Sequence, residues 1–156
     1  NIKHIVVACE KYIDGINNIA EKVKCESIDN LFIYQGNVHQ FFDEYCIEKL
    51  ISEIWILFPD PWPKKRHHKR RLINHAFLNY MHKFLKDSGR IMIATDSSSY
   101  MKLIFNLIYE LKHKYEWENQ NFQTWNYDFL DLAETKFYKK ALNSNRKSTF
   151  FSLKKI

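Results

Sequence analysis

The sequence contains little glycine, proline or cysteine, and it has no long hydrophobic run. No apolar stretch approaches the roughly 20 residues that span a bilayer, and nothing near its start has the order of segments of a secretory signal. The three cysteines, Cys9, Cys25 and Cys46, are far apart and form no C-x-x-C pair, which argues against a disulfide framework and a zinc site. These absences predict a soluble, cytoplasmic protein without a bound metal or a membrane.

What the chain does contain is a large share of core-forming residues and an excess of cations. Of its 156 residues, 46% are hydrophobic and 16% aromatic, which excludes wholesale disorder and suits one domain. The 24 Lys and Arg residues outnumber 18 Asp and Glu residues, so the formal net charge is +6. Such a balance favours an anionic partner, such as nucleic acid or an acidic membrane surface.

Short apolar runs alternate with segments of helical periodicity along most of the chain. This alternation predicts an α/β fold with a doubly wound, mostly parallel sheet. The expected strands are 4–9, 31–34, 53–58, 90–95, 115–123 and 148–153, and the expected helices are 14–24, 38–50, 74–86, 100–113 and 129–142. Gly89 suits the left-handed position that follows a helix.

The glycine-rich loop that such sheets place after their first strand is missing. Gly15, Gly36 and Gly89 lie far apart and form no G-x-G-x-x-G. The chain begins at Asn1 and enters a predicted strand almost at once, as if an earlier strand and its loop had been removed. Residues 1–156 are therefore expected to be a single domain from the carboxyl-terminal portion of a longer polypeptide, with an upstream domain as a further possibility.

All three prolines, Pro59, Pro61 and Pro63, fall within five residues directly after the strand at 53–58. Proline restricts the residue before it to extended backbone, so Asp60 is expected to be rigid. Open α/β sheets bind ligands at the carboxyl ends of their strands. There the Asp60 carboxylate could accept hydrogen bonds from a purine, and Trp62 could stack on a base.

Eight consecutive residues, 64–71, are all Lys, Arg or His. Such a run is more often a solvated face than a binding site. Here it follows a strand end and a rigid carboxylate directly, so its contacts with phosphates would bring an RNA base to Asp60.

The segment FPDPWPKKRHHKRRL, at 58–72, resembles the signature of the bacterial tRNA (guanine-N7)-methyltransferases. The likeness extends to VVACEKYIDGINN, IATDSSSYM and AETKFYKKA, and so over nearly the whole chain. It implies the Rossmann-like fold of class I methyltransferases, without its first strand. It also implies transfer of a methyl group from S-adenosylmethionine to N7 of a guanine in the tRNA variable loop.

The resemblance assigns roles residue by residue. Glu10 matches the acid that binds the ribose hydroxyls of the methyl donor, and Asp60 matches the central aspartate between donor and target base. Asn37 stands where the family usually has an aspartate near the donor's adenine. Lys64, Asp96, Thr135 and Tyr138 match substrate-binding positions, although Tyr138 replaces the glutamate of the family's T-K-F-E motif. The stretch that matches an RNA-binding segment comprises Arg66, His67, His68, Lys69, Arg70 and Arg71.

Methylation of guanine N7 needs no general base, because that nitrogen carries a lone pair and no proton. His67 and His68 are therefore expected to contact RNA. One alternative is a tRNA-binding remnant of the family that no longer holds the methyl donor, a reading favoured by the missing loop, Asn37 and Tyr138. A weaker alternative is another class I methyltransferase that uses D-P-W to methylate an amine.

Overall fold

The computed structural model describes residues 4–126 and 135–156. The chain divides into two compact units, Asn1–Ile47 and Glu48–Ile156, and each is described by itself. In the described part of the chain, no helix combines the length and the apolar character that a membrane span requires.

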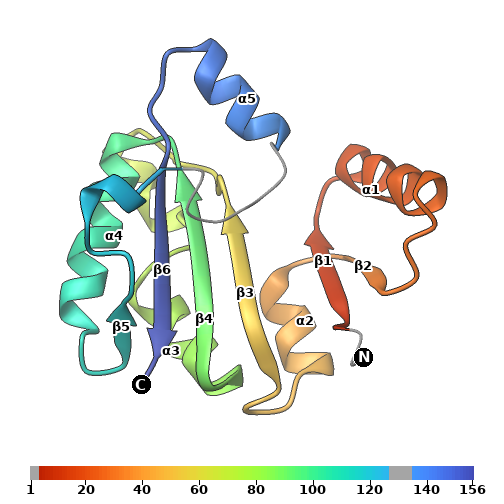
Figure 1. Cartoon of the computed structure of the whole chain (residues 1–156), viewed down its shortest axis with the longest axis horizontal. Coiled ribbons are helices and arrows are strands. Elements are labelled where there is room, and N and C mark those ends of the chain that lie inside the picture. The colour runs from red at the N-terminus through yellow and green to blue at the C-terminus, as the bar shows by residue number, and fades with distance from the viewer. Residues whose placement is uncertain (1–3, 127–134) are drawn as a thin grey trace. The chain divides into compact units, whose positions relative to one another are not determined.

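The first unit is a parallel strand pair with two helices. It runs β1 (Val6–Glu10), α1 (Ile13–Cys25), β2 (Leu31–Gln35) and α2 (Val38–Tyr45). β1 and β2 pair from Val6 opposite Leu31 to Glu10 opposite Gln35, so both strands end at the same edge (Figure 1). Glu10, the last paired residue of β1, and Asn37, two residues after the end of β2, therefore lie at one edge of the pair.

The second unit contains a four-stranded sheet in the order β3-β4-β6-β5. β3 and β4 are parallel, whereas β6 runs antiparallel to both of its neighbours. In chain order the elements are β3 (Ile51–Leu57), η1 (Lys65–Arg70), α3 (His75–Phe84), β4 (Leu85–Thr95), α4 (Ser98–Glu110), β5 (Tyr115–Trp117), η2 (Phe122–Thr124), α5 (Lys136–Asn143) and β6 (Thr149–Lys155).

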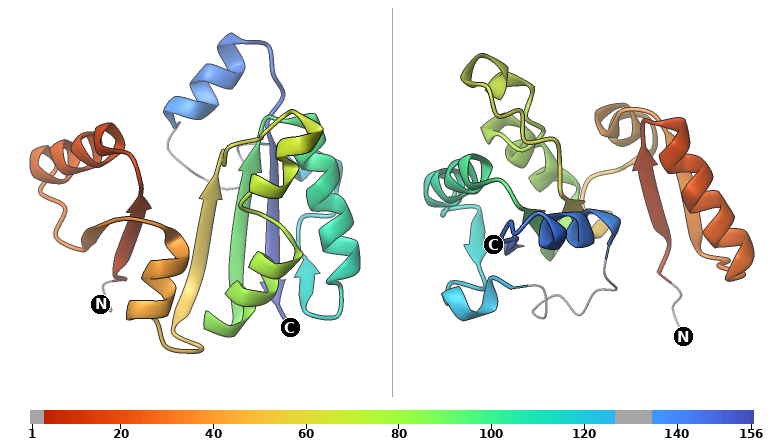
Figure 2. Two further views of the ribbon diagram at one scale, coloured as in Figure 1. Left: turned by 180° about the vertical axis from the view of Figure 1, so that it is seen from behind. Right: turned by 90° about the horizontal axis from the view of Figure 1, so that it is seen from above.

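The helices α3 and α4 cover the same face of this sheet (Figure 2). Their buried side chains meet those of the two central strands, because β4 is apolar and buried from Ile91 to Ala94 and β6 contributes Phe150, Phe151 and Leu153. The fully buried members of this core include Phe77, Leu78, Ile91, Ile93, Ile104 and Phe151. α5 lies instead over the end of the sheet at which β3 and β4 finish (Figure 1).

The predicted α/β class is confirmed, but the second sheet is mixed rather than mostly parallel. The antiparallel pairs both involve β6, which the sequence identified as a strand without giving its direction. Strand 115–123 is shorter than expected, because pairing ends at Trp117 and η2 follows. Of the helix expected at 129–142, positions 129–134 lie outside the described residues, and α5 forms the remainder.

The predicted role of Gly89 was wrong. Gly89 has no positive φ; the left-handed residue is its neighbour Ser88, with φ of 62°, and both residues lie within β4. A Cβ at Gly89 would lie 2.9 Å from the Lys86 carbonyl oxygen and 3.1 Å from that of Ser52. This glycine is needed because two backbone segments approach it closely.

Candidate functional site

The loop after β3 has an unusual backbone. Phe58 and Trp62 both adopt left-handed conformations, with φ of 53° and 41°, although neither is glycine. Such a conformation costs on the order of 1–3 kcal/mol per residue, so the surrounding contacts must hold it. One of these is the hydrogen bond from the Phe58 N–H to the Ala94 carbonyl oxygen, 2.8 Å, which continues the β3–β4 pairing.

Asp60 lies in the middle of this loop, with its side chain exposed. Phe58 anchors the start of the loop, since its ring lies 6.4 Å from that of Phe137 and 6.3 Å from that of Phe150. Pro59 and Pro61 fix their own φ angles on either side of the carboxylate. The carboxylate is therefore presented to solvent from a braced loop at the carboxyl end of a strand.

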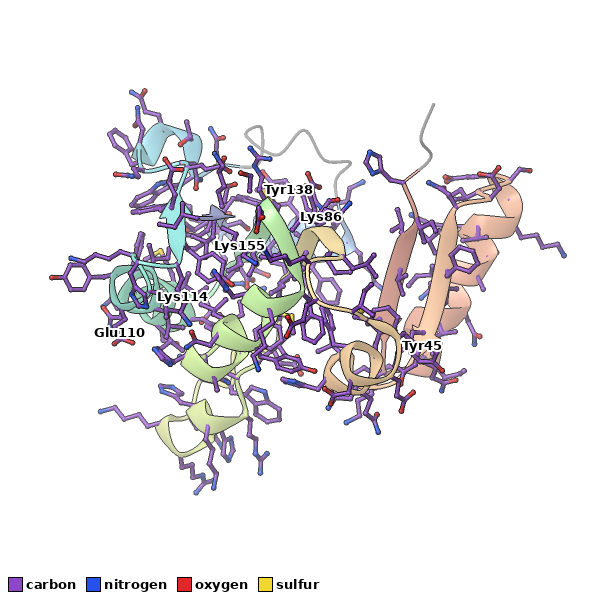
Figure 3. All side chains as sticks on the ribbon, turned by 90° about the horizontal axis from the view of Figure 1, so that it is seen from below. Tyr45, Lys86, Glu110, Lys114, Tyr138 and Lys155 are labelled. Carbon is purple, nitrogen blue, oxygen red and sulfur yellow. The ribbon has the colours of Figure 1, made fainter. Side chains whose placement is uncertain are left out.

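The cationic run forms η1 and its flanks, and most of it is exposed. Side chains tipped with nitrogen spread outward from this short helix (Figure 3). Arg70 lies over the Trp62 ring, with its guanidinium carbon 4.9 Å from the ring centre, and His67 meets the same ring edge-on at 5.8 Å. His67 and His68 are half-buried, whereas the exposed cations are Lys64, Lys65, Arg66, Lys69 and Arg70.

Arg71 differs from the rest of the run, because its side chain is only 3% exposed. It donates hydrogen bonds to protein oxygens of Pro61 and Ser99. Burial lowers the pKa of its guanidinium from the ordinary value, and the nearby Tyr100 partly offsets this effect. The structure therefore places Arg71 inside the protein rather than on the cationic surface.

Asp96 follows the end of β4 and pairs with a cation from a distant segment. Its Oδ2 accepts a hydrogen bond of 2.7 Å from Nε of Arg146, which lies between α5 and β6. The N-cap of α4 is Ser97, whose side chain accepts from the Tyr100 N–H. Because β3 and β4 are neighbouring parallel strands, the loops that carry Asp60 and Asp96 leave the same edge of the sheet.

Thr135 and Tyr138 belong to the start of α5. Thr135 is the N-cap, and its hydroxyl oxygen accepts from the Tyr138 N–H at 3.1 Å. A glutamate at position 138 would complete a capping box with Thr135. The tyrosine instead packs on Met92, Ala94 and Phe150. The substitution thus exchanges a polar side chain for an apolar contact with the sheet.

Glu10 and Asn37 lie in the first unit. Oε1 of Glu10 accepts hydrogen bonds from the N–H groups of Lys11, at 2.7 Å, and Tyr12, at 2.9 Å. A Cβ at Gly15 would come within 2.7 Å of this carboxyl group, so only glycine lets α1 approach it so closely. Asn37 is the N-cap of α2 and accepts from the His39 N–H at 2.9 Å.

The structure thus gathers the predicted residues at two sheet edges, one in each unit. Sequence reasoning missed Ser99 and Arg146 at the second edge. Arg146 is 50 residues from Asp96 along the chain, and no local pattern marks it. Within the described residues, no three His, Cys, Asp or Glu side chains are grouped so as to hold a metal ion.

Solved structures of methyltransferases share the fold of this chain. A "putative methyltransferase" of Streptococcus mutans in complex with SAH aligns with a TM-score of 0.62 at 14% identity, covering 97% of this chain and 76% of that one. An rRNA methylase of Streptococcus thermophilus aligns with a TM-score of 0.61 at 13% identity, covering 97% and 74%. The fold is therefore the Rossmann-like fold of class I methyltransferases.

Sequence comparison then gives the family. Residues 1–151 match the family model described as "Putative methyltransferase", and the chain belongs to that family. A tRNA (guanine-N(7)-)-methyltransferase of Wolbachia pipientis is 31% identical over 152 residues, covering 97% of this chain and 65% of the relative. One from Leptospira interrogans is 39% identical over 106 residues, covering 68% and 49%. The resemblance inferred from the sequence is confirmed, and the chain spans about half to two thirds of the length of these relatives.

Proposed function

We propose that this chain acts as a tRNA (guanine-N7)-methyltransferase, which transfers the methyl group of S-adenosylmethionine to N7 of a guanine in the tRNA variable loop. The observation that carries the proposal is the loop after β3. It presents the exposed Asp60 directly before a surface of exposed cations, at the edge of the sheet where Asp96 also lies. Relatives that bear this enzyme's name support the same activity.

The first unit offers groups that suit the methyl donor. A carboxylate has about four lone-pair sites, so Glu10 can hold two backbone N–H groups and still accept from two ribose hydroxyls. The helix contacts fix the orientation of this acid in advance. Asn37 would face the adenine through the part of its amide that the His39 N–H does not occupy. S-adenosylmethionine supplies an electrophilic methyl group on a sulfonium.

The second unit would hold the guanine. Asp60 would accept hydrogen bonds from the ring and exocyclic N–H groups of the base. Attack by N7 on the methyl group places positive charge on that base, so the carboxylate interacts more strongly in the transition state than in the ground state. Most of the remaining acceleration would come from alignment of the two reactants, because no proton has to be removed from N7.

Lys64 and Asp96, with Thr135 and Tyr138, would line the path to the base. The exposed cations of η1 would hold the tRNA backbone. Asp96 would line this path while paired with Arg146, so the substrate meets a neutralised ion pair rather than an isolated negative charge. This arrangement limits repulsion between the acid and the phosphates.

The direct test is methyl transfer to unmodified tRNA from labelled S-adenosylmethionine. The test uses this chain and the full-length natural protein, with N7-methylguanosine as the product measured. Asp60→Asn should lower the turnover rate by about 100-fold or more, as removal of a charge-stabilising group does elsewhere, while tRNA affinity stays within a few fold. The matched control is Asp87→Asn, the same change at an exposed acid that pairs with the surface lysine Lys49 at 3.3 Å.

Full activity in Asp60→Asn would refute the role given to this carboxylate. No product from either polypeptide, with tRNA still bound, would refute the enzyme and leave a tRNA-binding protein of the same family.

A further inference from the structure

Arg71 ends the cationic run, but its surroundings set it apart from the other seven positions. It is the buried member of the segment 64–71, whereas the rest are exposed or half-buried. A phosphate could reach its guanidinium only by displacing protein groups. The side chain therefore needs an explanation other than charge on the surface.

The guanidinium makes three hydrogen bonds to two separate segments, the loop after β3 and the first turn of α4. Nε donates to the Pro61 carbonyl oxygen at 2.8 Å. Nη1 donates to the Ser99 carbonyl oxygen at 3.2 Å, and Nη2 donates to the Ser99 Oγ at 2.7 Å. The planar fork of arginine suits such a bridge, whereas the single ammonium of lysine cannot reach all three acceptors in one plane.

An aromatic ring holds the guanidinium in this position. Its carbon lies 4.8 Å from the centre of the Tyr100 ring, which is fully buried. The Tyr100 hydroxyl in turn accepts a hydrogen bond of 2.7 Å from the Ile73 N–H, two residues beyond Arg71. Ring, guanidinium and backbone thus form one closed set of contacts.

The two bridged segments adjoin the acids of the candidate site. Pro61 follows Asp60 directly, and Ser99 stands in the first turn of α4, three residues after Asp96. The strands before these segments are paired as far as Leu57 opposite Ala94, and beyond that point the strand pairing no longer sets the distance between them. The Arg71 side chain joins the two segments beyond the end of this pairing.

We propose that Arg71 is a positioning residue, which fixes the Asp60 loop against the start of α4 and makes no contact with tRNA phosphate. The proposal rests on the proposed function, because it assigns Arg71 a part in presenting Asp60 to the target base. It separates the run into exposed cations that attract the tRNA and one buried cation that orders the site.

The test compares Arg71→Lys with Arg70→Gln in the natural polypeptide. tRNA binding is measured from 0.05 to 0.4 M salt, and turnover is measured at saturating tRNA. Arg71→Lys should lower the turnover rate at least tenfold and leave both tRNA affinity and the slope of log Kd against log salt unchanged. Arg70→Gln should reduce that slope by about 0.7–0.9, the value for one lost phosphate contact.

A second variant and a second measurement distinguish a local loss of positioning from a general loss of folding. Ser99→Ala removes one of the three acceptors and should give a smaller fall in turnover, which is not additive with Arg71→Lys. Amide hydrogen exchange in Arg71→Lys should speed up in segments 58–63 and 96–100 while the core of β4 and β6 stays protected. This measurement needs no methyl transfer, so it separates failure of the positioning role from failure of the proposed function.

Three results would overturn the proposal. A salt slope reduced as in Arg70→Gln would make Arg71 a phosphate contact. Unchanged turnover in Arg71→Lys would show that Arg71 does not position the site. Faster amide hydrogen exchange across the whole second unit would show that Arg71 stabilises the fold in general.

Discussion

The exposed cations of the segment 64–71 allow a quantitative prediction about tRNA binding. Five side chains are exposed: Lys64, Lys65, Arg66, Lys69 and Arg70. Each phosphate contact contributes about 0.7 to the salt slope for single strands and about 0.9 for duplexes. If all five cations meet phosphates, log Kd should change with log salt by a slope of about 3.5–4.5. Affinity should then fall by about 100- to 500-fold between 0.05 and 0.2 M salt.

The perturbation is the double variant Arg66→Gln with Lys69→Gln, which removes two of these cations. The slope should decrease by about 1.4–1.8. Affinity should fall by about 25- to 60-fold at 0.1 M salt but by only about threefold at 0.5 M, because the lost term is counterion release. The assay is filter binding or fluorescence anisotropy with unmodified tRNA at five salt concentrations.

The matched control also removes two positive charges, but at positions far from the cationic segment. Lys83 and Lys86 are exposed near the end of α3 and the start of β4, and so at the other end of β4 from the loop that carries Asp96. Lys83→Gln with Lys86→Gln should leave the slope unchanged. An equal fall in slope for both double variants would mean that net charge alone governs binding. An unchanged slope in the Arg66 and Lys69 variant would refute the phosphate contacts.

Two further predictions concern stability. Ile93 is fully buried in β4 between Ile56 and Phe151, so Ile93→Ala should lower the free energy of unfolding by about 2–5 kcal/mol, measured by urea denaturation. Burial raises the pKa of Glu118, but hydrogen bonds from Arg90 and Ser152 and the charge of Arg90 outweigh it and hold the pKa below 4.5. The stability that comes from this depressed pKa is present when the pH is above the ordinary pKa of a glutamate, and it is lost as the pH falls through the pKa of the folded state. Glu118→Gln should therefore make the free energy of unfolding fall less steeply below about pH 4.5. An equally steep fall with decreasing pH in the variant would contradict this.

Much of the site could be predicted because its signal is local in sequence. Pro59 and Pro61 restrict the backbone around Asp60, and the cationic run follows without interruption. Alternating apolar periodicity gave the order of strands and helices. The position of Asp60 after the third strand therefore needed no knowledge of tertiary contacts.

The remainder depends on contacts that sequence periodicity does not encode. The helix 74–86 was expected to continue to Lys86, but α3 ends at Phe84 because Leu85 already pairs with β3. Arg71 looks like its neighbours in sequence, and only the packing of Tyr100 and Ser99 distinguishes it. The direction of β6 depends likewise on which strand it meets.

Rigidity in the Asp60 loop comes from its surroundings as well as from its prolines. The two left-handed residues, Phe58 and Trp62, would relax if the loop were isolated, since each is strained. Phe58 is braced by β4 and α5, the Pro61 carbonyl by Arg71, and the Trp62 ring by Arg70 and His67. Residues of the cationic run therefore support the loop from which Asp60 projects.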